Sequence, residues 1–201
     1  MEIHVKDRIV AASKSLFFSR GLRSVTMDEI ASACGMSKKT LYLNFSSKEE
    51  LLQQIMVKMR DGLVEEIRGI LNRVSSPVLA RLREVINAVS SHSLQFSPIF
   101  LEDMKRFHPE AWRELQAYKH DGLADAIHAV IREGQAQGYI RAPLSESFII
   151  HVCFTLMDDI LTPETSLELS MSFPDLFEQV MSLLFEGFLT QEGKKALYYI
   201  E

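Results

Sequence analysis

Two helix start signals lie close together near the N-terminal end of this 201-residue chain. Thr26 is followed three residues later by Glu29, a capping box that predicts the start of a helix ending at about residue 34. Gly35 and Met36 then form a tight turn, and Ser37 can cap a second helix that reaches about residue 45. This pair of short helices restricts the N-terminal part of the chain to a small helical domain.

Helical periodicity continues through the rest of the chain, whereas strand signals are nearly absent. In the first segment an apolar face recurs every three or four residues, at Val5, Ile9, Ala12 and Leu16. This spacing predicts a helix over residues 3–20, which Gly21 can end in a left-handed conformation. A second capping box at residues 47–50 predicts the start of a long helix that reaches about residue 73.

The remaining patterns predict an all-α fold. Further helices are expected over residues 77–96, 108–138, 144–161 and 174–189, and the loop over residues 162–173 has room for one extra turn. The chain is therefore expected to have a small N-terminal helical domain, residues 1–50, followed by a larger helical body, residues 51–201.

The charge distribution bears on the partners of these two parts. The net charge of −5 argues against a nucleic-acid partner for the chain as a whole, because phosphate binding needs cations. Residues 1–55, however, contain eight Lys or Arg and six Asp or Glu, so that the cations gather at the N-terminal end. No apolar run approaches the roughly 20 residues that span a bilayer, and no signal peptide is recognisable. A cytoplasmic protein without membrane contact is expected.

Motifs for metal binding and catalysis are weak. Cys34 and Cys153 match no metal or disulfide spacing and are expected to be reduced, packed thiols. Asp121, Asp125 and His128 share one helix face at workable metal-ligand spacing, but a solvated polar face is the favoured interpretation. Nucleophile elbows, Gly-rich phosphate loops and paired-cysteine motifs are not found. We therefore expect no cofactor, no metal and no enzymatic activity.

The short helix over residues 37–45 has two different sides. Leu41 and Phe45 face inward, whereas the other side carries a cation, a hydroxyl, a phenol and an aliphatic group. These are Lys39, Thr40, Tyr42 and Leu43. Such a mixture suits contact with phosphates, base edges and thymine methyl groups in the major groove of DNA.

The residues from Ser37 to Leu51, read as SKKTLYLNFSSKEEL, resemble the signature of the tetracycline-repressor (TetR) family of transcription regulators. The resemblance covers about 50 residues, back to Ile9. It implies contacts to the DNA backbone from Thr26, Ser37, Thr40, Tyr42 and Lys48. It implies base reading by Lys38, Lys39, Leu43 and Asn44. The family often has glycine at the position of Lys39 and an aromatic residue or histidine at positions 43 and 44. Because this chain departs from that pattern, the resemblance predicts DNA binding but not the sequence of the operator.

Two apolar helices near the C-terminus predict a homodimer. The helix over residues 174–189 is apolar around most of its circumference, and residues 148–157 are similar, which favours a twofold four-helix interface. The candidate interface residues are Phe154, Val180, Leu183, Leu184, Gly187 and Phe188. Packing within the chain's own core is the alternative. A twofold dimer would read double-stranded DNA at a near-palindromic operator, with half-sites about 34 Å apart.

Between these regions lie large, adaptable apolar side chains. They are Phe96, Phe100, Met104, Phe107, Trp112, Tyr118 and Met157. The resemblance implies that the body, residues 51–201, binds a small-molecule effector as well as its dimer partner, while simple core packing is the alternative. The expected function is that of a repressor released from DNA by a small apolar or amphipathic compound. A DNA-binding adaptor controlled by a protein partner is the second hypothesis, and an enzyme built on the helical body is the third.

Overall fold

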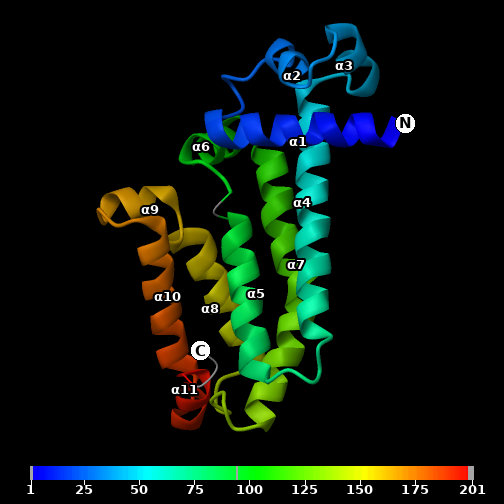
Figure 1. The fold of residues 1–201 in the computed structure, drawn as a ribbon. Helices are drawn as coiled ribbons and strands as arrows, with labels where there is room; N and C mark the ends of the chain where they lie inside the picture. The colour runs from blue at the N-terminus through cyan, green and yellow to red at the C-terminus, as the bar shows by residue number, and fades with distance from the viewer. Residues whose placement is uncertain (1, 94, 199–201) are drawn as a thin grey trace. The chain divides into compact units, whose positions relative to one another are not determined.

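The computed structural model describes residues 2–93 and 95–198, and it leaves the side chains of residues 2–4, 93, 114–126, 158, 163 and 198 undescribed. In this part of the chain the structure is helical, with one isolated bridge between Ile140 and Leu189. The helices are α1 (Glu2–Arg20), α2 (Met27–Ala33), α3 (Lys38–Asn44), α4 (Lys48–Leu71), α5 (Val78–Ser93), α6 (Pro98–Phe107), α7 (Pro109–Ala136), α8 (Glu146–Thr155), the π-helical turn η1 (Leu156–Ile160), α9 (Pro163–Glu168), α10 (Phe173–Phe188) and α11 (Gln191–Tyr198) (Figure 1). The predicted all-α fold is confirmed.

The chain divides into two compact units. Unit 1 contains residues 1–63 and 91–115, and unit 2 contains residues 64–90 and 116–201. Unit 1 thus extends beyond the expected domain boundary at residue 50, because it also includes more of α4, the whole of α6 and the start of α7. Within the described residues, no helix is long and apolar enough to cross a membrane.

The local signals at the start of unit 1 produce the expected helices. Gly21 ends α1 with a φ of 81°, a left-handed conformation in which glycine avoids a side-chain clash. Thr26 Oγ1 accepts a hydrogen bond from the N–H of Glu29 at 3.2 Å, and Glu29 Oε2 accepts one from the N–H of Thr26 at 2.8 Å. Ser37 Oγ accepts from the N–H of Thr40 at 3.1 Å and caps α3. The capping box and the second cap are therefore confirmed.

Helix α6 completes the core of unit 1. The sequence pattern predicts no helix over residues 98–107, but Ser97 caps one and Pro98 occupies its first turn. Phe100 is fully buried, and its ring centroid lies 4.7 Å from that of Phe18 on α1 and 5.3 Å from that of Phe96. Helices α1–α3 carry more apolar surface than they can cover by themselves, so a helix distant in sequence packs onto them.

A buried ion pair organises unit 2. The side chain of Arg81 on α5 is 4% exposed, and its Nη2 lies 2.5 Å from Glu133 Oε1 on α7. Arg81 also donates from Nε to the carbonyl of Ser76 at 3.2 Å and from Nη1 to the carbonyl of Leu71 at 3.3 Å. One guanidinium therefore joins the end of α4, the following turn and α7.

The C-terminal elements of unit 2 differ from the expected pattern in two places. The helix expected over residues 144–161 ends as an α-helix at Thr155 and continues as the π-helical turn η1. Helix α11 was not predicted, because it is short and its position depends on tertiary contacts. Thr190 caps it by accepting from the N–H of Gly193 at 3.0 Å and also donates to the carbonyl of Gly138 at 2.7 Å. The extra turn expected in the loop over residues 162–173 is present as α9.

Candidate nucleic-acid interface and apolar cavity

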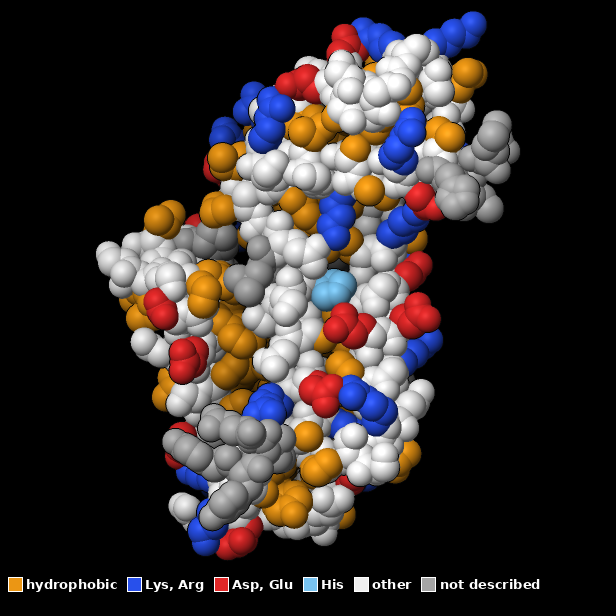
Figure 2. All heavy atoms as spheres, viewed as in Figure 1, with side chains coloured by type: hydrophobic (Ala, Val, Ile, Leu, Met, Phe, Trp, Pro, Cys, Tyr) orange, Lys and Arg blue, Asp and Glu red, His pale blue; other side chains and the backbone are white. Residues whose placement is uncertain are grey.

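Helix α3 presents a polar side to solvent and an apolar side to the core of unit 1. Leu41 is fully buried and Phe45 is 3% exposed, whereas Tyr42 is 46% and Leu43 is 77% exposed. Lys39 is also exposed. The predicted division of this helix into two sides is confirmed. Figure 2 shows Lys and Arg side chains over this end of unit 1, with acidic side chains beside them.

Two of the predicted base-reading residues already form contacts within unit 1. Lys38 Nζ lies 2.7 Å from Asp28 Oδ1 on α2, and Asn44 Nδ2 donates to the carbonyl of Thr40 at 2.8 Å. Lys39, in contrast, is exposed to solvent. The side chains available for a new partner without breaking such a contact are therefore Lys39, Tyr42 and Leu43.

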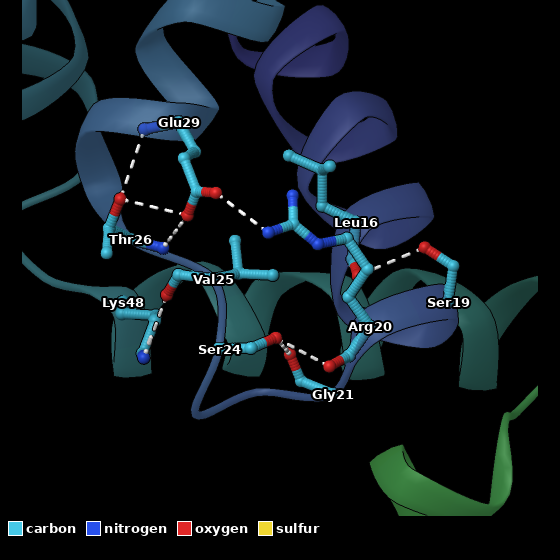
Figure 3. Close-up of polar contacts among 9 residues, drawn as sticks. All are labelled: Leu16, Ser19, Arg20, Gly21, Ser24, Val25, Thr26, Glu29 and Lys48. Atoms are coloured by element: carbon cyan, nitrogen blue, oxygen red, sulfur yellow. Dashed lines mark hydrogen bonds and ion pairs between the residues drawn. The ribbon is translucent and has the colours of Figure 1, made fainter.

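A small polar network fixes the start of α2 (Figure 3). Glu29 Oε1 accepts from Arg20 Nη2 at 2.8 Å, while its other oxygen accepts from the backbone of Thr26. The hydrogen bond from the Thr26 backbone, followed by that from Arg20, lowers the pKa of Glu29 below its usual range. A depressed carboxyl pKa stabilises the fold above the unfolded pKa, and this contribution is lost as the pH falls through the lower folded value. The cap therefore holds at neutral pH and weakens in acid.

Lys48, at the first position of α4, has two partners inside unit 1. Its Nζ donates to the carbonyl of Leu22 at 2.8 Å and to that of Val25 at 3.1 Å, and Figure 3 shows the contact with Val25. A lysine ammonium has three donors, so one remains for a phosphate. The sequence predicted only the contact to DNA. It gave no sign of these carbonyl contacts, because they depend on how α4 packs against the α1–α2 connection.

The structure does not bring the predicted ligand residues together around one cavity. Phe100 and Met104 are fully buried in the core of unit 1, with Phe96 and Trp112 packed against that core. Phe107 lines an open hollow of about 620 Å³ on unit 1, whose wall mixes apolar residues with Glu49, Arg60, His108, Glu110 and Arg113. Met157 lines a separate cavity in unit 2. The side chain of Tyr118 lies outside the described part of the chain.

The cavity in unit 2 has an entirely apolar wall. It has a volume of about 60 Å³ and lies among α5, α7, α8, η1 and α10. Its lining includes Val85, Ile127, Cys153, Met157 and Phe185. Burial raises the pKa of the Cys153 thiol to about 11, so this group is neutral at physiological pH. An apolar cavity of this kind stays free of water and has no charge to offer a ligand.

The predicted dimer residues divide between the surface and the interior of unit 2. Leu183 is 73% exposed, and Gly187 is exposed with open space beside its Cα. Four others are buried within unit 2 itself: Phe154, Val180, Leu184 and Phe188. Phe148 on α8, which is not among the predicted interface residues, is 55% exposed. Because both helices are apolar around most of their circumference, the sequence pattern does not separate the inner face from the outer one.

Of the three residues that share metal-ligand spacing on α7, the structure describes only the side chain of His128. His128 Nδ1 lies 3.2 Å from Glu146 Oε2, and Arg132 Nε donates to the other oxygen of Glu146 at 2.9 Å. Arg132, followed by His128, lowers the pKa of Glu146. No group of three His, Cys, Asp or Glu able to hold a metal occurs in the part of the chain that the structure describes. The side chains of Asp121 and Asp125 lie outside it.

The α2–turn–α3 arrangement, with one side of α3 free, is a helix-turn-helix, which is a class of DNA-binding unit. Residues 9–55 match the family model of bacterial regulatory proteins of the tetR family. This segment belongs to the DNA-binding domain of the TetR family of transcriptional regulators, as the sequence predicted. Proteins of this family are not enzymes, and the expectation that this chain is not one is confirmed by its relatives.

The relatives extend the match beyond the helix-turn-helix. The chain is 25% identical to the HTH-type transcriptional regulator YvaF of Bacillus subtilis, over 94% of this chain and 98% of that protein. It is 24% identical to the HTH-type transcriptional repressor KstR2 of Mycobacterium tuberculosis, over 72% of this chain and 73% of the repressor. The solved structure of the fatty acid degradation regulator FadR of Bacillus halodurans shares the fold, with a TM-score of 0.68 and 21% identity, covering 91% of this chain and 95% of that one.

Proposed function

We propose that the protein is a dimeric cytoplasmic repressor that binds a near-palindromic operator and releases it when an apolar small molecule enters unit 2. The free side of α3 is the observation that carries this proposal. Lys39, Tyr42 and Leu43 are exposed on a helix whose opposite side is fixed in the core. A cation, a phenol and an aliphatic group on a rigid helix can contact guanine edges, phosphates and thymine methyl groups respectively.

Substitutions on α3 should separate sequence reading from general affinity. Lys39→Ala is expected to reduce discrimination between operator and scrambled duplex by about 1 to 3 kcal/mol, because one contact to a base edge is lost. Tyr42→Ala is expected to weaken binding to both duplexes by a similar factor, because a phosphate contact carries no sequence information. The operator would first be selected from a pool of random duplexes, and affinities measured by fluorescence anisotropy at fixed salt.

Lys58→Ala is a matched control for charge, because Lys58 lies on α4 and pairs with Asp7 on α1. It should leave the preference for operator unchanged. If the unmodified protein selects no sequence from the pool, the chain does not read DNA as proposed.

The proposed effector is an uncharged, largely apolar molecule. The wall of the unit 2 cavity is apolar throughout, so a charged group placed there would lose its hydration without gaining a partner. At about 60 Å³ the cavity holds only a small group in its present form, and the flexible side chains of Met157 and Met181 provide the means to enlarge it. Relatives named for ketosteroid and fatty acid degradation regulation support an apolar effector.

Straight-chain alcohols of four to ten carbons provide a direct probe of this cavity. A chain that fits should raise the unfolding midpoint by several degrees, since occupancy at one hundred times the dissociation constant adds about 2.7 kcal/mol of stability. Cys153→Leu, which fills part of the cavity, should reduce that shift by half or more. Val74→Leu at a position 79% exposed serves as the control. Equal shifts in both variants would place the alcohols elsewhere, and the effector proposal would fail.

We further infer that two copies pair through the outer faces of α8 and α10. Phe148 and Leu183 are large apolar residues exposed on these helices, and Gly187 permits close approach of a second backbone. A twofold pair would mirror the symmetry of the operator.

A further inference from the structure

The connection between α1 and α2, residues 21–26, is held by two side chains of opposite charge from two different helices. On one side, Lys48 of α4 donates to the carbonyls of Leu22 and Val25. On the other, Asp103 of α6 accepts from the N–H of Arg23 through Oδ2 at 2.9 Å. Both contacts lie within unit 1. The connection leads directly to Thr26, the cap of α2 (Figure 3).

Asp103 is well placed to hold this connection firmly. The residue is 8% exposed, so its carboxylate is largely removed from water, where a hydrogen bond to a charged group is stronger than a neutral one. The guanidinium of Arg23 also lies 4.7 Å from the ring centroid of Phe107 at the end of α6. Both the backbone and the side chain of Arg23 are thereby attached to α6.

Helix α6 approaches the connection as closely as the absence of a side chain permits. A Cβ built on Gly21 would lie 2.5 Å from Ile99 Cγ2 and 2.8 Å from Asp103 Oδ2. The N–H of Ser97 adds a hydrogen bond to the carbonyl of Phe18 at 3.1 Å. The first turn of α6 therefore packs directly on the end of α1 and leaves no room for a water layer.

From these contacts we propose that Asp103 is a positioning residue for the DNA-binding surface. It fixes Arg23, three residues before the cap of α2, and thereby sets where α2 and α3 begin relative to α6. Lys48 holds the neighbouring carbonyls from α4. A change in the separation of α4 and α6 must therefore break one of these contacts or carry α2 with it. The proposal rests on the DNA-binding function proposed above.

The test compares Asp103→Ala, Asp103→Asn and the control Glu102→Ala, which alters the exposed neighbouring position on α6. Asp103→Ala should lower affinity for the selected operator about tenfold while changing affinity for scrambled duplex less than twofold. Asp103→Asn keeps an oxygen that can accept from Arg23, so its operator affinity should stay within about threefold of the unmodified protein. Glu102→Ala should behave like the unmodified protein.

A second measurement does not depend on DNA. Hydrogen exchange at the amide of Arg23 should be faster in Asp103→Ala than in Asp103→Asn, whereas amides in the middle of α4 should be unaffected. A purely stabilising role would instead reduce binding to both duplexes equally and speed exchange throughout unit 1. Equal operator affinity in Asp103→Ala and the unmodified protein, or an asparagine variant as impaired as the alanine one, would overturn the proposal. If no duplex is preferred by the unmodified protein, the DNA-binding proposal fails, and the Arg23 exchange still tests the contact itself.

Discussion

Replacement of Glu133 by alanine is expected to lower the free energy of unfolding by about 3 kcal/mol, because it leaves a buried guanidinium without its carboxylate. Arg81 is almost fully buried and has two backbone carbonyls as its other partners. Those neutral groups cannot replace the lost negative charge. This loss in the free energy of unfolding lies at the lower end of the range for buried pairs, because the side chain of Glu133 is 34% exposed and water can enter in its place. Urea titration followed by circular dichroism measures the change.

The same unit contains an exposed pair that serves as control. Arg73 and Glu84 form an ion pair in which the side chains are 48% and 40% exposed. Surface pairs contribute at most about 1 kcal/mol, so Glu84→Ala should have a small effect. Similar losses in Glu84→Ala and Glu133→Ala would mean that burial of Arg81 does not determine the stability of unit 2.

The second large effect is expected at Gly21, where alanine should destabilise unit 1 by about 3 kcal/mol. A side chain in the left-handed conformation costs about 1 to 2 kcal/mol, and forcing a methyl group into a packed contact adds about 1 to 3 kcal/mol. The methyl group would meet the side chains of Ile99 and Asp103. Operator affinity should fall as well, because α6 would have to move away from the start of the helix-turn-helix.

Gly35 separates these two contributions. It also has a positive φ, 60°, but a Cβ there would meet nothing within 4 Å. Gly35→Ala should therefore cost only the conformational part, about 1 to 2 kcal/mol. Thermal unfolding of both variants measures the difference, and an equal loss at the two positions would show that the contact with α6 is not tight in solution.

Much of the fold could be predicted from interactions between residues close in sequence. The exposed side of α3 could be predicted in the same way. The caps at Thr26 and Ser37, the glycine at position 21 and the apolar face of α1 act over a few residues, so the sequence alone revealed the starts of α2 and α3. The exposed side of α3 followed from helix geometry applied to Leu41. Such features need no knowledge of distant neighbours.

Features that depend on tertiary packing could not be predicted in this way. Nothing near Phe100 in the sequence indicates that it packs on Phe18, so the sequence predicts a ligand site for a residue that lies in the core of unit 1. The two carbonyl contacts of Lys48 and the burial of Phe154 have the same origin. In each case the partner lies far along the chain, and an apolar pattern alone does not say which of several apolar surfaces it meets.

The apolar wall of the unit 2 cavity has a consequence for selectivity. A site built from hydrogen-bonding groups rejects a compound that lacks the matching atom, because its own buried polar groups then go unpaired. Aliphatic and aromatic side chains contain no buried polar group that could be left unpaired. One methylene more or less in the ligand therefore changes the binding free energy by only about 1 to 3 kcal/mol. A regulator with this cavity would distinguish compounds by their length and width. It would respond to a group of chemically unrelated molecules of similar size.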